Sequence, residues 1–374
     1  MSEQIKFNDL PAQWRDIKEN VLPLIEELGS RGDFIGGKAI SKFEEEFAKY
    51  TGSKHAIGVS NGTDGLKIAF QLFNLNEEDC VVLPSNTFIA DYLAIKNCPI
   101  KQPQVVLVDN DVNFTINVDD LSDFLDNNRE RYRKVVVVPV HLYGYSCDMD
   151  TLEKLKNKHD LLILEDCSQS HGTLYKDKHV GYLGDVSVYS LYPGKNLGAM
   201  GDAGIITTNN EGFYRRCRSL TNYGSSIKYH YDELGNNHRM DTIQAIVLSE
   251  KLKHLSKWTE NKNKVAQRYL NEIKNDKIIL PIEDSNCYNS YHIFCVRVNN
   301  DTRENFQKYL NEHGITTIIH YPIPIHDTQI FNNSDTVYSS LLTDQYKDKI
   351  VSLPMHPYLN DKELTFIIDK INKF

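Results

Sequence analysis

The strongest constraint on the fold is an alternation of short apolar runs and helical segments through the first half of the chain. Five of these runs are mostly apolar, and they occupy residues 56–60, 80–84, 104–109, 134–141 and 161–166. A strand that is apolar along its whole length is buried on both faces, as in a parallel sheet covered by helices. The sequence therefore predicts an α/β protein with a mainly parallel sheet, and ligands of such sheets bind at the carboxyl ends of the strands.

The second half of the chain predicts a different arrangement. A long amphipathic helix is expected over residues 241–275, with shorter strand and helix patterns after it. Another amphipathic helix is expected over residues 10–30. We therefore expect a large domain at residues 1–250 that includes the N-terminal helix, and a smaller C-terminal α/β domain at residues 251–374.

Composition narrows the class of protein. The formal net charge of −9 argues against broad nucleic-acid binding, which needs a basic face, and no apolar run is long enough for a membrane span. The seven cysteines are scattered and never spaced Cys-x-x-Cys, so neither a zinc site nor a disulfide framework is predicted. The first residues, 1–6, have no apolar core of a signal peptide. These features predict a cytoplasmic protein without a metal site.

The most unusual local sequence surrounds Lys195. A strand-like run ends at Ser190, the Pro193-Gly194 pair bends the chain, and three glycines follow within ten residues of the lysine. Glycines allow the backbone to approach a bulky group closely. Our hypothesis is that Lys195 forms a Schiff base with an aldehyde cofactor, and the alternative is an ordinary solvated loop lysine.

Two further segments carry chemistry that would suit such a cofactor. Gly62 and Thr63 lie between a short strand and a helix, where free N–H groups can bind a phosphate. Asp166 ends a buried strand and would lie at the mouth of the sheet. The alternatives are a plain turn at Gly62 and a helix-capping role for Asp166. A Schiff-base lysine, a phosphate-binding helix start and a carboxylate that keeps a pyridine nitrogen protonated are together what pyridoxal phosphate needs.

Eight motifs in this order resemble the DegT/DnrJ/EryC1/StrS family of sugar-nucleotide aminotransferases. The motifs are VSNGTD (59–64), PSNTF (84–88), VHLYG (140–144), EDCSQSHG (165–172), SLYPGKNLG (190–198), GNNHRMD (235–241), HYPIPIH (320–326) and SLPMHP (352–357). The resemblance implies the fold of type I aminotransferases. Its large domain has a mixed, mostly parallel seven-stranded sheet flanked by helices, and a smaller C-terminal α/β domain follows.

The resemblance also assigns roles to residues. It implies pyridoxal 5'-phosphate as the cofactor, which becomes pyridoxamine 5'-phosphate during the cycle, with Lys195 and Asp166 as the catalytic residues. The other cofactor contacts that it implies are Gln169 at the ring hydroxyl, Phe88 stacked on the ring, Gly62, Thr63 and Ser190 at the phosphate, and Asn237 from a neighbouring subunit. An active homodimer with shared sites is therefore expected.

The implied reaction moves an amino group from L-glutamate to a keto sugar linked to a nucleoside diphosphate, a step of deoxyamino-sugar and glycan biosynthesis. The motifs are most similar to the branch that acts on C3 of dTDP-linked 3-keto-6-deoxyhexoses. The alternatives are C4 as the acceptor carbon and UDP as the nucleotide. Candidate contacts to the nucleotide sugar are Lys228, Tyr229, His320, Tyr321 and His326.

Two alternatives belong to other classes. A non-catalytic regulator that binds the cofactor or the sugar would be expected to lack the lysine or to carry a DNA-binding domain, and neither is seen in the sequence. A general amino-acid aminotransferase would need an arginine for the substrate carboxylate, and the sequence offers none in a recognisable context.

Overall fold

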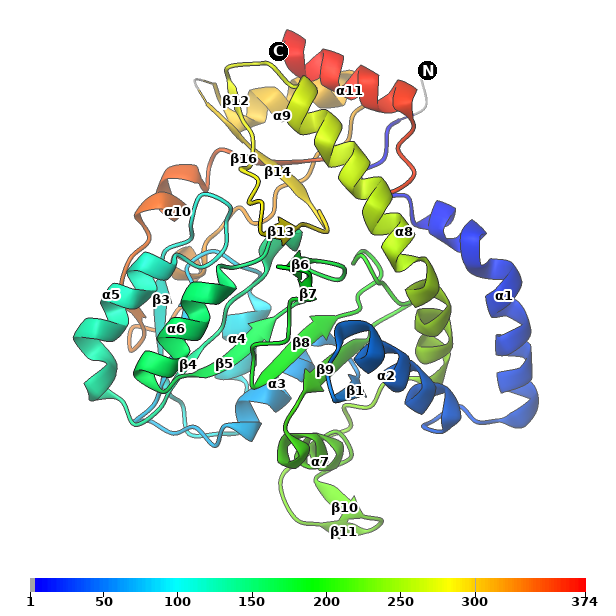
Figure 1. The fold of residues 1–374 in the computed structure, drawn as a ribbon, viewed down its shortest axis with the longest axis vertical. Coiled ribbons are helices and arrows are strands. Elements are labelled where there is room, and N and C mark those ends of the chain that lie inside the picture. The colour runs from blue at the N-terminus through cyan, green and yellow to red at the C-terminus, as the bar shows by residue number, and fades with distance from the viewer. Residues whose placement is uncertain (1–3, 300) are drawn as a thin grey trace.

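The computed structural model describes residues 4–299 and 301–374. Residues 1–3, which belong to the segment without a signal-peptide pattern, lie outside the described residues. Figure 1 shows a large α/β layer structure with a smaller sheet and the C-terminal helix above it, at the end where both chain termini lie. A long helix, α8 (Thr242–Glu272), runs from the large sheet to the smaller one.

The main sheet is mixed and mostly parallel, as predicted. Its order is β1-β9-β8-β5-β4-β2-β3-β15, and only the β1–β9 and β9–β8 pairs are antiparallel. The strands are β1 (His55–Val59), β2 (Cys80–Pro84), β3 (Gln104–Val108), β4 (Val135–Val137), β5 (Leu162–Asp166), β8 (Val186–Ser190), β9 (Gly204–Thr208) and β15 (Thr336–Val337). The first seven match the seven expected strands, and the two-residue β15 adds an eighth at the edge.

The apolar strands alternate between two cores, which explains their composition. Val81 and Leu83 of β2 pack with α3 (Gly62–Leu72) and α4 (Ala90–Lys96) on one face. Cys80 and Val82 point to the other face, towards α2 (Lys38–Thr51), α5 (Val118–Asn128) and α6 (Met149–His159). Burial on both faces stabilises the sheet by about 25 cal/mol for each Å² of apolar surface removed from water.

The smaller sheet, β12-β14-β16, follows α8. It consists of β12 (Ile278–Ile279), β14 (Phe294–Val298) and β16 (Ile350–Leu353), with α9 (Arg303–Glu312) and α11 (Asp361–Lys373) nearby. Helix α8 continues without a break across residue 250, so the boundary predicted there lies within a helix. The division into domains at 250 stays a prediction.

The remaining elements lie at the periphery. They are α1 (Leu10–Arg31), α7 (Glu211–Leu220), α10 (Leu341–Tyr346), the β6–β7–β13 sheet (Leu174–Tyr175, Lys178–His179 and Cys287–Tyr288) and the β10–β11 hairpin (Ser225–Ile227 and His230–Tyr231). The hairpin projects beyond α7, away from the body of the molecule (Figure 1). No helix among the described residues has the length and apolarity to cross a membrane.

Candidate active site

A cavity of about 980 Å³ opens at the carboxyl ends of β1, β2, β5 and β8. Its wall brings together most of the residues that the sequence singled out. Those residues are Gly62, Thr63, Phe88, Asp166, Gln169, Ser190, Lys195, His320 and Tyr321. The cavity therefore lies where the parallel-strand rule predicts a ligand.

The N-terminus of α3 forms one end of the cavity. Asn61 caps the helix, because its side-chain oxygen accepts from the Asp64 N–H at 2.8 Å and its carbonyl accepts from the Gly65 N–H at 3.1 Å. The first N–H groups of a helix have no intrahelical partner. Gly62 and Thr63 occupy the first two positions of α3, and both line the cavity. A Cβ on Gly62 would lie 2.7 Å from the Ser190 Cβ, so only glycine allows the helix start to approach Ser190 this closely.

Asp64 has a structural role beside this helix start. Its Oδ2 accepts from the Ser60 hydroxyl at 2.5 Å, from the Asn61 amide at 2.8 Å and from the His238 Nδ1 at 3.1 Å. Burial alone would raise the pKa of Asp64, but the hydrogen bonds from His238, Ser60 and Asn61 outweigh it and lower that pKa to about 2. Asp64 is therefore ionised, and its carboxylate holds the capping loop in place. It leaves the N–H groups at the start of α3 free to bind an anion.

The end of β5 and the loop after it supply two polar side chains, Asp166 and Gln169, to the cavity wall. Asp166 is 5% exposed, and its Oδ1 accepts from the Ser168 N–H at 2.8 Å. The Gln169 Oε1 accepts from the Tyr143 N–H at 2.8 Å, and its amide nitrogen donates to the Tyr321 hydroxyl at 3.0 Å. These contacts fix the orientation of both side chains before any ligand binds.

An aromatic pair borders the same space. Phe88 is 48% exposed and its ring lies 5.4 Å from that of Tyr321, at an interplanar angle of 43°. A large apolar ring with so much open surface is available to stack on a planar ligand. His320, beside Tyr321, bonds to the Ser352 hydroxyl at 2.9 Å, and burial followed by the charge of Lys195 lowers its pKa to about 4.

Lys195 projects from the loop after β8. Burial lowers the pKa of Lys195 to about 8, although Asp166 and Asp91 oppose this shift. An amine with this pKa is partly neutral near neutral pH, as a nucleophile must be. Lys195 is half-buried in the cavity wall, and its role as the Schiff-base lysine stays a prediction.

Three side chains of α8 hold the lysine loop in place. The Lys262 amine donates to the Asn196 side-chain oxygen at 2.7 Å, and the Lys251 amine donates to the Gly198 carbonyl at 2.6 Å. The Gln244 Oε1 accepts from the Met200 N–H at 2.8 Å. The sequence interpretation missed these residues, but intervals of seven and eleven residues place all three on one face of a helix, and that spacing was a usable signal.

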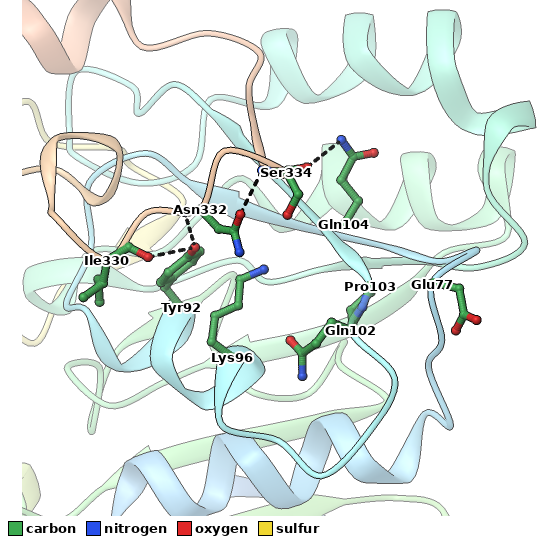
Figure 2. Close-up of a pocket in the computed structure, with 9 residues that line it drawn as sticks. All are labelled: Glu77, Tyr92, Lys96, Gln102, Pro103, Gln104, Ile330, Asn332 and Ser334. Carbon is green, nitrogen blue, oxygen red and sulfur yellow. Dashed lines mark hydrogen bonds between the residues drawn. The ribbon is translucent and has the colours of Figure 1, made fainter.

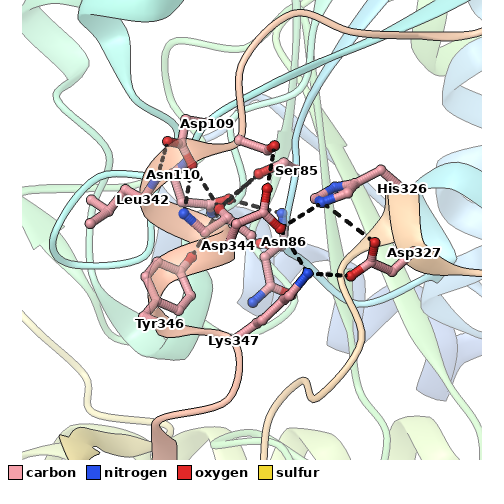
Figure 3. A network of polar contacts seen from close by, with 12 residues as sticks. Ser85, Asn86, Asp109, Asn110, His326, Asp327, Leu342, Asp344, Tyr346 and Lys347 are labelled. Atoms are coloured by element: carbon pink, nitrogen blue, oxygen red, sulfur yellow. Dashed lines mark hydrogen bonds and ion pairs between the residues drawn. The ribbon is translucent and has the colours of Figure 1, made fainter. Parts of the chain in front are cut away.

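Four of the predicted residues lie outside this cavity. Lys228 and Tyr229 are on the exposed β10–β11 hairpin. Asn237 is exposed and pairs with Asn222, at the base of the 222–237 loop that carries this hairpin. His326 belongs instead to a polar network, in which its Nε2 lies 3.2 Å from Asp344 (Figure 3). His326 therefore does not line this cavity, and its role as a contact to the nucleotide sugar stays a prediction.

A second cavity, of about 480 Å³, lies at the β3 edge of the sheet (Figure 2). Tyr92 and the 330–334 segment form one side of it, and the Tyr92 hydroxyl accepts from the Asn332 N–H at 2.9 Å. Its lysine, Lys96, is ion-paired with Asp335 at 2.7 Å. The Lys96 amine is thus paired with a carboxylate and is not available as a nucleophile. We interpret this second cavity as part of the packing between β3 and β15 and not as a reactive site.

The mixed sheet, the lysine loop and the small C-terminal sheet together define a protein of the aminotransferase class. The chain belongs to the DegT/DnrJ/EryC1/StrS aminotransferase family, whose sequence profile matches residues 15–372.

Relatives with known names give the same result. The chain is 40% identical, over 92% of both sequences, to the dTDP-3-amino-3,6-dideoxy-alpha-D-galactopyranose transaminase of Aneurinibacillus thermoaerophilus. It is similar to the crystal structure of DesV from S. venezuelae in complex with a ketimine intermediate, with a TM-score of 0.92, 31% identity and coverage of 100% of this chain and 98% of that one. It is also similar to NtdA from Bacillus subtilis with bound cofactor PMP, with a TM-score of 0.85, 27% identity and coverage of 95% and 81%.

Proposed function

We propose that this protein is a pyridoxal-phosphate-dependent aminotransferase that acts on a nucleotide-linked keto sugar. L-Glutamate is the proposed amino donor, and C3 of a dTDP-3-keto-6-deoxyhexose is the favoured acceptor. The observation that carries this proposal is the shared cavity, whose wall contains the α3 N-terminus, the Asp166 carboxylate and the Lys195 amine. The name of the A. thermoaerophilus relative supports the choice of a dTDP-linked sugar and of C3.

The residues of the cavity fit the proposed cofactor. The free N–H groups of Gly62 and Thr63 and the Ser190 hydroxyl would hold its phosphate, since helix N-termini favour anions. Asp166 would hold the proton of the pyridine nitrogen, and Gln169 would hydrogen-bond the ring hydroxyl. When bound, pyridoxal phosphate supplies an aldehyde carbon that carries the amino group and a ring that accepts electrons.

The Lys195 amine has two tasks in this proposal. It holds the cofactor between turnovers, and it then acts as the base that takes the α-proton of the amino donor and later returns a proton to the acceptor carbon. Its pKa of about 8 suits both tasks, because proton exchange is most efficient with a group that titrates near the working pH. Phe88 would stack on the cofactor ring, and Tyr321 borders the same space.

We further propose a cytoplasmic homodimer. The seven cysteines are all free thiols, which fits a reducing compartment. The 222–237 loop, which carries the β10–β11 hairpin, lies outside the cavity of its own chain and includes Lys228, Tyr229 and Asn237. These three residues would complete the site of a second copy, with Asn237 at the phosphate. His320 and Tyr321 remain the proposed sugar contacts from the same chain.

Spectroscopy tests the reaction class. The purified protein with pyridoxal phosphate should absorb near the visible edge, and glutamate should shift the band. The Lys195→Ala variant should lose turnover, whereas Lys154→Ala, which removes an exposed lysine, should keep it. The absence of a shift with any amino donor, or normal turnover by Lys195→Ala, would contradict the proposal.

A substrate panel tests the acceptor. The enzyme is incubated with glutamate and dTDP- or UDP-linked 3-keto and 4-keto sugars, and products are identified by mass and NMR. We expect the dTDP-linked 3-keto sugar to be aminated fastest. Faster amination at C4 would replace the C3 assignment and leave the aminotransferase assignment unchanged.

A further inference from the structure

A carboxyl group that the proposed mechanism does not use lies behind the cavity. Asp91 is in the first turn of α4 and is completely buried. Its Oδ2 accepts from the Thr87 hydroxyl at 2.9 Å. Its Oδ1 is also buried and has no hydrogen-bond donor among the described residues. A buried carboxylate normally has hydrogen-bond donors for both oxygens, so an ionised Asp91 would lack one of the donors that it needs.

The neighbour of Asp91 explains the missing donor. The carboxyl of Asp166 is a charged neighbour of Asp91 that opposes its ionisation, and each group can only accept a hydrogen bond when both are ionised. The Asp166 Oδ1 is already satisfied by the Ser168 N–H. Two buried carboxylates in contact repel each other strongly, and one proton held between them removes the repulsion and supplies the missing donor.

The other groups around the pair do not replace this proton. Lys195 is the nearby cation, and its charge acts on both carboxyls, but it forms no ion pair with either among the described residues. The Tyr321 hydroxyl accepts from the Gln169 amide at 3.0 Å, and it forms no hydrogen bond to either carboxyl among the described residues. Burial, and after it the charge of Asp166, hold the pKa of Asp91 well above its usual range.

We propose that Asp91 is a neutral acid that donates a hydrogen bond to Asp166, so that the two side chains share one negative charge and Asp166 is held towards the cofactor. This inference rests on the proposed function, because it gives Asp91 a positioning role in the same site. One charge on the pair matches the single positive charge of a protonated pyridine nitrogen. Two charges would leave one carboxylate buried without a counterion.

A competing explanation is that Asp91 is ionised and stabilises the N-terminus of α4 through the helix dipole. The two explanations differ in the protonation state and in the effect of an amide. Asparagine has nearly the same shape as aspartic acid and can donate to Asp166, so Asp91→Asn should preserve a donor but not a charge. Asp91→Ala removes both.

Infrared spectroscopy tests the protonation state. The carbonyl stretch of a protonated carboxylic acid is separate from the carboxylate bands, and the difference between wild type and Asp91→Asn isolates the contribution of this one residue. We expect a protonated-acid band at neutral pH in the protein, with and without cofactor, that is lost in Asp91→Asn. A wild-type spectrum without that band would overturn the proposal.

Cofactor affinity tests the positioning role. Asp91→Asn should bind pyridoxal phosphate within about threefold of wild type, and Asp91→Ala should bind on the order of tenfold more weakly, with a shifted absorption band. Equal losses in the two variants would overturn the proposal, and circular dichroism excludes misfolding of Asp91→Ala as their cause. These readouts do not depend on turnover, so a protein without aminotransferase activity would contradict the proposed function and still report on the Asp91 proton.

Discussion

At the scale of single residues, the site depends on how burial sets the state of each titratable group. Lys195 and Asp64 illustrate the two outcomes. Burial dominates at Lys195 and lowers its pKa to about 8, because its carboxylate neighbours compensate only in part. Hydrogen bonds dominate at Asp64, which stays charged with a pKa of about 2. The cavity therefore contains an amine, that of Lys195, that loses its proton readily. Beside the start of α3, the Asp64 carboxylate stays ionised.

The lowered pKa of Lys195 predicts its reactivity in the cofactor-free protein. An amine attacks an aldehyde only when it is neutral, so the rate of reductive methylation of Lys195 should rise with pH around 8. Mass spectrometry of peptides after treatment with formaldehyde and a borohydride reagent measures this rate. The exposed Lys154 in the same sample serves as the control. Parallel profiles for the two lysines would contradict the lowered pKa.

The same shift predicts how stability depends on pH. The folded-state pKa of about 8 lies below the ordinary 10.5, so between these values the unfolded chain binds more protons and the free energy of unfolding rises with pH. Below pH 8 the folded protein bears the full cost of a buried ammonium group. Lys195→Met should therefore stabilise the cofactor-free protein by about 1–3 kcal/mol at pH 7, after allowance for partial exposure. Urea denaturation at pH 7 and pH 10 measures the difference, which should shrink at the higher pH; a constant difference would contradict this account.

At the scale of elements, the sequence predicted the parts that obey a repeating pattern. The apolar runs predicted five of the strands, and the strand–turn–helix pattern at Gly62 predicted the helix start, because local periodicity and turn chemistry determine both. The seven-stranded sheet followed from the family resemblance. The eighth strand, β15, was not predictable, since its two residues pair with β3 more than two hundred positions away. The proximity of Asp91 to Asp166 was hidden for the same reason, because the two residues belong to separate elements, α4 and β5.

The close approach of α3 to β8 is a further property of elements, and it can be tested by adding one methyl group. In Gly62→Ala the new Cβ would lie 2.7 Å from the Ser190 Cβ and 3.1 Å from its Cα, so α3 or β8 must move. Overpacking of this kind costs about 1–3 kcal/mol. We expect affinity for pyridoxal phosphate to fall on the order of tenfold, as measured by absorbance titration.

Gly29→Ala is the matched control for this substitution. Gly29 lies inside α1, and a Cβ there would meet nothing within 4 Å. Alanine should raise the free energy of unfolding by up to about 1 kcal/mol at this helix position and leave cofactor affinity unchanged. Unchanged affinity in Gly62→Ala, or an equal loss in both variants, would refute the steric explanation.

At the scale of the whole molecule, the cavity lacks some of the residues that the sequence assigned to it. Asn237 lies on the 222–237 loop, which carries the projecting β10–β11 hairpin. On this hairpin the side chains of Tyr229 and Tyr231 are 75% and 64% exposed. Aromatic side chains at the tip of a projecting hairpin are typical of a surface that contacts another protein. The sequence could identify Asn237 from its motif, but only an assembly can say which cavity it reaches.

Complementation between two inactive variants tests whether Asn237 serves the partner's site. Lys195→Ala lacks the reactive amine, and Asn237→Asp would place a negative charge beside the phosphate. If Asn237 acts across the dimer, a mixed dimer has one site with both defects and one intact site. Coexpression with two different tags allows the mixed dimer to be purified, and its activity should be about half that of wild type. Each variant alone should be nearly inactive, and the exposed neighbour Asn236→Asp should be active. A mixed dimer as inactive as its parents would show that Asn237 acts within its own subunit, because each site would then retain one defect.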